Sequence, residues 1–219
     1  QNTAVGHQAL SLNTSANNNS AFGRTALANN STGADNSAVG LGALGNNTTG
    51  SNNAALGMQS LNQNTTANSN TAAGYQAMYA NTTGTSNTAL GREALSSNTT
   101  GVENVAIGRE AMDNNTSGGK NVAVGLHALL SNTTASENTA VGYQAAYANT
   151  PGSRNVAIGD VALQLNTTAS RNVAIGRSSL QSLNTTGDTY NVAVGYNALA
   201  LTTTGQFNTA MGASALVSN

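Results

Sequence analysis

The side chains able to do acid–base or metal chemistry are few in this chain and lie far apart. It contains two histidines and no cysteine among 219 residues. His7 and His127 fall in distant units of a tandem repeat, about 34 Å apart if the units stack at the spacing of β-strands. They therefore cannot share a metal ion or a proton, and we expect both to be ordinary surface residues. We expect no catalytic residue, no metal and no cofactor.

One pair of carboxylates comes closer to a catalytic arrangement. Glu93 and Glu110 occupy the same position in successive repeat units, so they would stack one above the other. Two nearby carboxylates can act as general acid and base in glycoside hydrolysis. However, Arg92 and Arg109 directly precede them, and the sequence implies no pocket. The favoured interpretation is therefore a solvated patch of mixed charge.

Tyrosines are the best candidates for binding. Tyr75, Tyr143 and Tyr196 share one position of the repeat, and Tyr79 and Tyr147 share another. Exposed aromatic side chains on a polar surface could contact a carbohydrate or a protein receptor. The alternative is that these rings simply cover the adjacent turn.

The repeat emerges when the chain is aligned on Asn-x-Ala-x-Gly. Its consensus is N-(T/V)-A-(V/I/L)-G-x-x-A-L-x-x-N-T-T-(G/A)-x-x, whose 17 positions are called columns 1 to 17. Thirteen units follow, the last one incomplete, and the unit from Asn172 carries two extra residues among Gln181–Tyr190. The units begin at Asn2, Asn19, Asn36, Asn53, Asn70, Asn87, Asn104, Asn121, Asn138, Asn155, Asn172, Asn191 and Asn208.

Three columns do not vary within the chain: Asn in column 1, Ala in column 3 and Gly in column 5. A column restricted to Ala has room for one methyl group. A column restricted to Gly needs a positive φ or a close approach of another backbone. Column 4 is always apolar, and column 9 is Leu, Met or Ala. Columns 6 and 7 accept many residue types, so we expect them to face water.

The spacing predicts strands and turns rather than helices, because Gly and N-T-T-G recur too often for helices to persist. The T/V-A-V/I segment alternates as a strand does. We expect a turn at Gly, a second short strand around columns 8 and 9, and a broad turn at N-T-T-G. The predicted fold is all-β, a β-solenoid of thirteen coils in one domain spanning residues 1–219. Stacked at about 4.8 Å, these coils would extend roughly 60 Å.

Each unit has too little apolar surface to be stable alone, so its neighbours must complete the core. We expect columns 4 and 9 to form apolar ladders inside the solenoid. We expect the Asn column to form a ladder of side-chain amides from coil to coil. Column 3 would then lie on the outside, and an all-Ala face is suited to close packing. We therefore predict a homo-oligomer that associates through this Ala face.

The low charge excludes several function classes. Only 7% of residues are charged and the net charge is −1, so no basic stripe for nucleic acid is present. No apolar run is long enough to span a membrane. Column 17 holds charges of alternating sign, at Glu103, Lys120, Glu137 and Arg154, which should modestly fix the register of the coils. The N-x-S/T matches in the turn, at Asn13, Asn30, Asn47, Asn64, Asn81, Asn98, Asn115, Asn132, Asn166 and Asn184, are interpreted as turn chemistry rather than glycosylation sites.

The N-V-A-I-G motif at 104–108, 155–159 and 172–176 resembles the head repeats of YadA-type trimeric autotransporter adhesins. The longer N-T-A-V-G-Y-Q-A at 138–145, with N-T-T-G turns elsewhere, is similar to repeats of phage and bacterial tail-fibre proteins. The resemblance covers essentially the whole chain. It implies a left-handed parallel β-roll, three chains around one axis, and a fibre exposed on a cell surface or a virion. The unit is longer here than in the adhesin heads.

From these features we expect an extracellular structural or adhesive fibre module, a piece of a longer fibre protein, that gives a stiff shaft and binds a receptor or glycan through many copies. Two alternatives remain. One is an ice-binding solenoid, suited by low charge and by Thr in columns 13 and 14. The other is a self-assembling filament of an extracellular matrix or surface layer. An enzyme is not expected, because a regular array offers no unique pocket.

Overall fold

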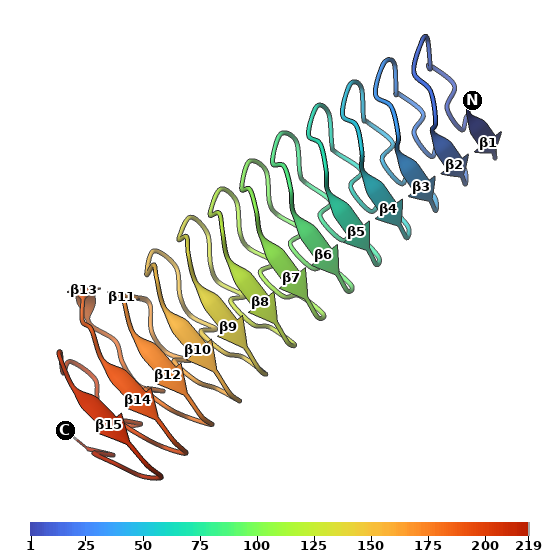
Figure 1. The fold of residues 1–219 in the computed structure, drawn as a ribbon. Helices are drawn as coiled ribbons and strands as arrows, with labels where there is room; N and C mark the ends of the chain where they lie inside the picture. Colours follow the sequence, from blue (N-terminus) through green and yellow to red (C-terminus); the bar gives the residue numbers. More distant parts are fainter. Residues whose placement is uncertain (219) are drawn as a thin grey trace. The chain divides into compact units, whose positions relative to one another are not determined.

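The computed structural model describes residues 1–218 and is all-β, with no helix in that range. It is a parallel β-solenoid of about twelve turns of about 17 residues, which confirms the predicted fold class (Figure 1). The strands are β1 (Thr3–Val5), β2 (Ser20–Phe22), β3 (Ser37–Val39), β4 (Ala54–Leu56), β5 (Thr71–Ala73), β6 (Thr88–Leu90), β7 (Val105–Ile107), β8 (Val122–Val124), β9 (Thr139–Val141), β10 (Val156–Ile158), β11 (Thr168–Ser170), β12 (Val173–Ile175), β13 (Thr186–Asp188), β14 (Val192–Val194) and β15 (Thr209–Met211).

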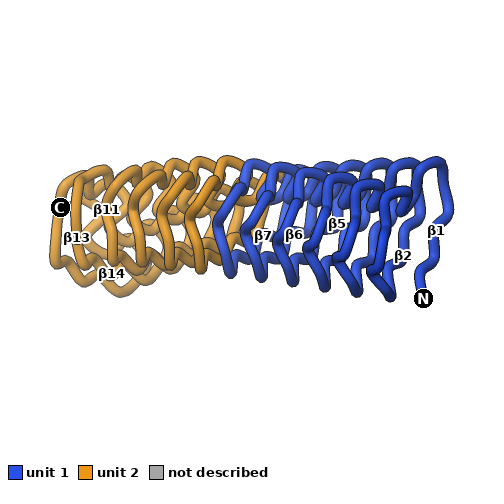
Figure 2. Tube along the Cα trace, turned by 90° about the horizontal axis from the view of Figure 1, so that it is seen from above, with its two compact units in different colours: residues 1–109 blue, residues 110–219 orange. Residues whose placement is uncertain are grey.

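The chain divides into two compact units, residues 1–109 and residues 110–219, coloured separately in Figure 2. In unit 1, β1 to β7 pair in parallel in sequence order. In unit 2, β8, β9, β10, β12, β14 and β15 do the same. Each column lies beside itself in the next coil, as Ala21 does beside Ala38 and Ala140 beside Ala157.

The orientation of the strand is the reverse of the prediction. From Ala21 onward, the Ala of column 3 is buried inside the coil, whereas columns 2 and 4 point outward and are exposed or half-exposed. The Ala face is therefore not free to meet another chain. The interior explains this, because the Leu side chains of column 9, such as Leu44 and Leu129, are fully buried there. These Leu side chains leave space for only a methyl group on the inner side of the strand, so the Ala of column 3 is the residue that points inward.

The expected second strand is absent from the described residues. Columns 6 to 11 form turns, and columns 7 and 9 adopt positive φ, for example 51° at Gln76 and 55° at Met78. The backbone still bonds from coil to coil there, as from Met78 N–H to Ala94 O at 2.9 Å. Left-handed residues turn the chain within a few positions, so the coil closes without a second extended wall. The apolar column 9 is inside, as expected.

The glycines of column 5 meet both of the conditions inferred from the sequence. Gly142 has φ +136°, and a Cβ on it would lie 2.4 Å from the carbonyl oxygen of Gly159 in the next coil. A side chain is excluded both by the backbone conformation and by this contact. The invariant Gly is therefore a requirement of stacking.

Two ladders of buried asparagines tie the coils together. In column 1, Asn36 Nδ2 donates to Gly50 O at 2.8 Å, and Asn36 Oδ1 accepts the N–H of Asn53 at 3.0 Å. This confirms an Asn ladder, although its regular coil-to-coil bond is from backbone N–H to side-chain oxygen. In column 12, expected only as a turn, Asn47 Nδ2 donates to Asn30 Oδ1 at 2.7 Å and also to Gly50 O.

The column 12 ladder also decides how the N-x-S/T matches are interpreted. From Asn30 to Asn166 their side chains are buried and bonded to each other or to carbonyl groups. Asn13 is half-buried, and Asn184 is exposed. The repeated N-T-T is thus the chemistry of a buried ladder.

Candidate binding surfaces

The residues considered for acid–base chemistry are exposed or half-buried. His7 is exposed in unit 1. In unit 2, His127 Nε2 lies 2.9 Å from Glu110 Oε2, and the His127 ring meets Tyr147 edge-on. Glu93 pairs with Arg92 at 3.1 Å. Among residues 1–218 no pocket is found, and no three His, Cys, Asp or Glu side chains are grouped as a metal site would need.

The five tyrosines are not gathered into one site. Tyr75 and Tyr79 belong to one coil of unit 1, and Tyr143 and Tyr147 belong to one coil of unit 2. Tyr75, Tyr143 and Tyr196, in column 6, are exposed, as predicted for that column. Tyr79 and Tyr147 are half-buried, and the hydroxyl of Tyr79 accepts a hydrogen bond from Gln63 Nε2 at 3.3 Å. Each exposed ring would thus offer a separate point of contact and is not part of one shared site.

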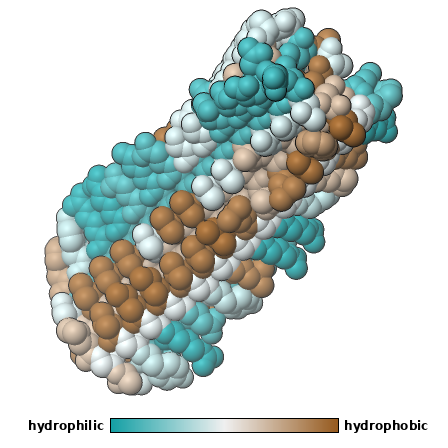
Figure 3. Space-filling model, turned by 45° about the vertical axis from the view of Figure 1, so that its right-hand side comes forward, coloured by the Kyte–Doolittle hydropathy of each residue, from teal (hydrophilic) through white to brown (hydrophobic). Residues whose placement is uncertain are grey.

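A continuous apolar surface lies on the strands of unit 2, and it is called here the unit 2 outer face. It consists of columns 2 and 4 of the six stacked strands. Figure 3 shows apolar side chains gathered in such a band on one side of the molecule. The face is lined by Val122, Val124, Thr139, Val141, Val156, Ile158, Val173, Ile175, Val192, Val194, Thr209 and Met211.

The corresponding outer face of unit 1 has a different character. Its column 2 begins with Thr3, Ser20 and Ser37 rather than Val. Its column 4 varies in size, from Phe22 to Ala73. The apolar residues therefore form one row in unit 1 and two rows in most of unit 2.

Paired charges border the unit 2 outer face. In column 17, Arg154 Nε lies 2.7 Å from Glu137 Oε2 in the preceding coil. On the column 6 side, Arg177 lies 3.2 Å from Asp160. The hydrogen bond from Arg154 and its positive charge lower the pKa of the Glu137 carboxyl, and the same contact raises the pKa of Arg154. The sequence predicted this opposite-sign stacking of column 17.

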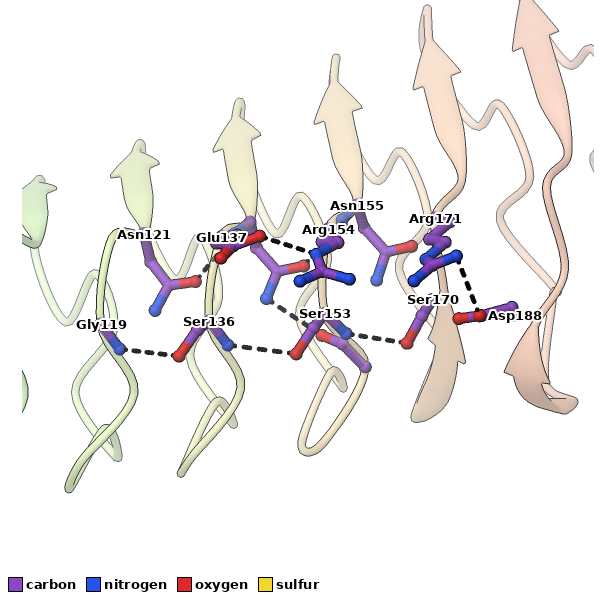
Figure 4. Close-up of polar contacts among 12 residues, drawn as sticks. Gly119, Asn121, Ser136, Glu137, Ser153, Arg154, Asn155, Ser170, Arg171 and Asp188 are labelled. Atoms are coloured by element: carbon purple, nitrogen blue, oxygen red, sulfur yellow. Dashed lines mark hydrogen bonds and ion pairs between the residues drawn. The ribbon is translucent and has the colours of Figure 1, made fainter.

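A row of serines supports the charged column from column 16, shown with it in Figure 4. Gly119 N–H donates to Ser136 Oγ at 3.0 Å, Ser136 N–H donates to Ser153 Oγ at 3.2 Å, and Ser153 N–H donates to Ser170 Oγ at 3.0 Å. Each hydroxyl satisfies a backbone donor of the coil before it. The row holds the backbone of column 16 in register beside the ion pairs.

The two extra residues create a feature that sequence reasoning missed. In this longer coil Thr186–Asp188 form β13, which pairs in parallel with β11 outside the main sheet. Next to it, Arg171 lies 3.2 Å from Asp188 and stacks over the ring of Tyr190, which in turn stacks on Phe207. The signal was present in column 17, which changes from charged side chains to aromatic ones at Tyr190 and Phe207.

The fold and these surfaces define a repeat protein of the parallel β-solenoid class with long, shallow faces. Comparison of the chain with protein-family models, with curated proteins and with solved structures finds no match. Of the residues that the structure describes, none belongs to a helix long and apolar enough to cross a membrane.

Proposed function

We propose that this chain is a structural and adhesive module of an extracellular fibre, the shaft or head of a tail fibre or surface adhesin. The observation that carries the proposal is the unit 2 outer face. Its apolar side chains recur at every coil and are flanked by ion pairs such as Glu137–Arg154. An apolar centre with a polar rim is the anatomy of a protein interface. On this proposal the chain has no catalytic role.

The proposed occupant of the face is the same face of another copy of the chain. The net charge of −1 and the paired rim charges leave little repulsion between copies. Because successive strands repeat the same side chains, rotational symmetry would match the face along its length. The resemblance to trimeric adhesin heads favours three chains, each a left-handed solenoid, around one axis. Columns 2 and 4 thus replace the Ala column as the proposed contact.

Receptor attachment is proposed for the side that remains outside such an assembly. Column 6 is exposed and carries varied side chains, including Tyr143 and Tyr196. Copies along one chain and across three chains would present many weak contacts at once. Multivalent binding of this kind gives high avidity without any single strong site.

The hydrogen bonding of the turn disfavours the ice-binding alternative. The column 13 hydroxyls donate to carbonyls of the next coil, as from Thr48 Oγ1 to Thr65 O at 2.9 Å and from Thr82 Oγ1 to Thr99 O at 3.0 Å. The hydroxyl donors of column 13 are therefore already used, so columns 13 and 14 do not present two adjacent rows of free Thr hydroxyl donors. A thermal-hysteresis assay tests this alternative, and clear activity would contradict the fibre proposal.

The mass of the 219-residue chain in solution tests the proposed assembly. Light scattering after size exclusion should give a discrete trimer. Val156→Asp combined with Val173→Asp should shift the mass to that of a monomer, because charges would be buried against the partner. The matched control is Ser117→Asp with Thr134→Asp, exposed in the turn of the same unit, which should stay trimeric. A monomeric parent chain, or an open-ended polymer as the matrix-filament alternative expects, would overturn the proposal.

A further inference from the structure

The longer coil from Asn172 displaces its N-T-T motif from the buried ladder of column 12. Leu183 occupies column 12 in this coil and is fully buried, where the preceding coil has Asn166. The motif therefore begins one position later, with Asn184 in column 13. The backbone N–H of Asn184 donates to Thr203 O at 2.9 Å, so the following coil is in place beside it. The Asn of this motif is thus not used by the ladder.

The first and third residues of the displaced motif, Asn184 and Thr186, both have exposed side chains. Asn184 Oδ1 accepts a hydrogen bond from Thr167 Oγ1 at 2.8 Å. Within the described part of the chain, neither Asn184 Nδ2 nor the Thr186 hydroxyl donates a hydrogen bond. Thr186 begins β13, which pairs with β11 outside the main sheet (Figure 1). A Cβ added at Gly187 would meet no atom within 4 Å, so the segment after the motif is open.

Most other N-x-S/T triplets of the chain are closed by burial. Thirteen more triplets occur besides the one at Asn184. In eight of them the Asn is buried and Nδ2 donates within the column 12 ladder, as Asn132 does to Asn115 Oδ1 at 2.8 Å and to Ala135 O. These eight are Asn30, Asn47, Asn64, Asn81, Asn98, Asn115, Asn132 and Asn166. Their amide groups are reached only if the coil opens.

The remaining five triplets are closed by hydrogen bonds. Asn13 is half-buried, and its Nδ2 donates to Ala16 O at 3.2 Å. Three others donate from Nδ2 to a side chain of the next coil, namely Asn18, Asn29 and Asn46. Asn114 is exposed, but two residues further on the Thr116 hydroxyl donates to Thr133 O at 3.1 Å. Among residues 1–218, both groups are exposed and free of such bonds only in the triplet at Asn184.

We propose that Asn184 is an N-glycosylation site, whose Nδ2 accepts a hexose from a nucleoside diphosphate hexose through an N-glycosyltransferase. The bond between the anomeric carbon of the hexose and the diphosphate breaks, and that carbon bonds to Asn184 Nδ2. The amide gives up one proton, and the nucleoside diphosphate leaves. An attached sugar is bulky and hydrated, so it requires a surface position such as this one. The site is independent of the proposed assembly, because Asn184 lies in the turn and not in columns 2 and 4.

Enzymatic glucosylation of the folded 219-residue chain tests the site. The probes are UDP-glucose and a soluble N-glucosyltransferase that modifies the free synthetic peptide 180–189. Intact mass and mapping of the modified peptide provide the readout. We expect one hexose, on Asn184, added at least about tenfold faster than at any other Asn, because a buried amide is available only after local opening. The peptide 128–137, which carries Asn132 without the fold, should be modified about as fast as 180–189.

Two threonine variants of the triplet form a matched pair. Thr186→Ala removes the hydroxyl of the N-x-S/T motif and should abolish the modification, as should Asn184→Gln. Thr185→Ala changes only the middle residue of the motif and should retain the modification. Circular dichroism confirms that each variant keeps its β-structure. An unmodified folded chain, a folded chain modified at Asn114 or Asn132 as fast as at Asn184, or equal loss with Thr185→Ala would overturn the site.

Discussion

The two units have the same interior and different exteriors. In both, column 1 is Asn, column 3 is Ala and column 5 is Gly, and the same hydrogen bond from the backbone N–H of one column 1 Asn to the side-chain oxygen of the preceding one joins successive coils. Outside, unit 1 carries Ser, Thr or Ala in column 2 of its first six strands, where unit 2 carries mainly Val. Before Arg92 the chain has only two charged residues, Arg24 and Asp35. Stacking therefore constrains the inward-facing columns, and any difference in function between the two units must come from the outward-facing columns.

The largest expected effect tests whether the two interiors are equivalent. Gly57→Ala in unit 1 and Gly142→Ala in unit 2 each place a Cβ within 2.5 Å of a carbonyl oxygen, at positive φ. Each should lower the free energy of unfolding by about 3 kcal/mol or more, and by similar amounts. Denaturant unfolding measures both. Gly187→Ala, at φ +81° with open space around it, should cost about 1 kcal/mol. A much smaller cost in one unit would show that its coils are more loosely stacked.

An exchange of column 2 between the units sharpens the comparison of the exteriors. Val156→Thr with Val173→Thr makes the unit 2 outer face like that of unit 1, and it should weaken self-association by about tenfold or more. Thr71→Val with Thr88→Val is the reverse exchange in unit 1, and it should not weaken association. Sedimentation over a range of concentrations measures both. Equal weakening by the two exchanges would refute a special role for unit 2.

The smallest effect concerns the ion pair between Glu137 and Arg154 that borders the unit 2 outer face. Because Arg154 lowers the pKa of Glu137, the pair stabilises the folded state above the ordinary pKa of a glutamate. That contribution is lost as the pH falls through the lowered pKa. In Arg154→Gln, the pKa of Glu137 should rise towards its ordinary value, which NMR titration of the carboxyl measures. Added salt should reduce the shift in the parent chain. An unchanged pKa in the variant would show that Arg154 is not its cause.

The sequence allowed the period, the parallel stacking, the role of Gly in column 5 and the Asn ladder of column 1 to be predicted. It did not reveal which face of the strand is inside. Alternation with period two is the same whichever face is buried, and exchanging the faces sends every side chain to the other side. Apolar Val and Ile were assigned to the interior. The size of Leu in column 9, which leaves space only for Ala, was the physical clue that was missed.

Two other features were hidden for separate reasons. The second strand was expected because Ala-Leu carries no local signal of positive φ, and non-Gly residues seldom adopt that conformation. Here the closure of the coil requires a positive φ at the Leu residues of column 9, such as Leu27 and Leu61. The aromatic cluster was missed because the two extra residues displace Tyr190 from the 17-residue count. Alignment on column 17 would have placed it beside Arg171.

The close contact at column 5 makes every coil stack on the next one in the same way. Because each Gly packs closely against the backbone of its counterpart in the next coil, as Gly6 does against Gly23 and Gly195 against Gly212, whole 17-residue units could be added or removed while the other coils keep the same kind of contact. Each added unit advances the stack by about 4.8 Å. Duplication or deletion of repeat units in the gene would thus change the length of the stack in equal steps. A protein designer could set the spacing between two attached domains by choosing the number of units.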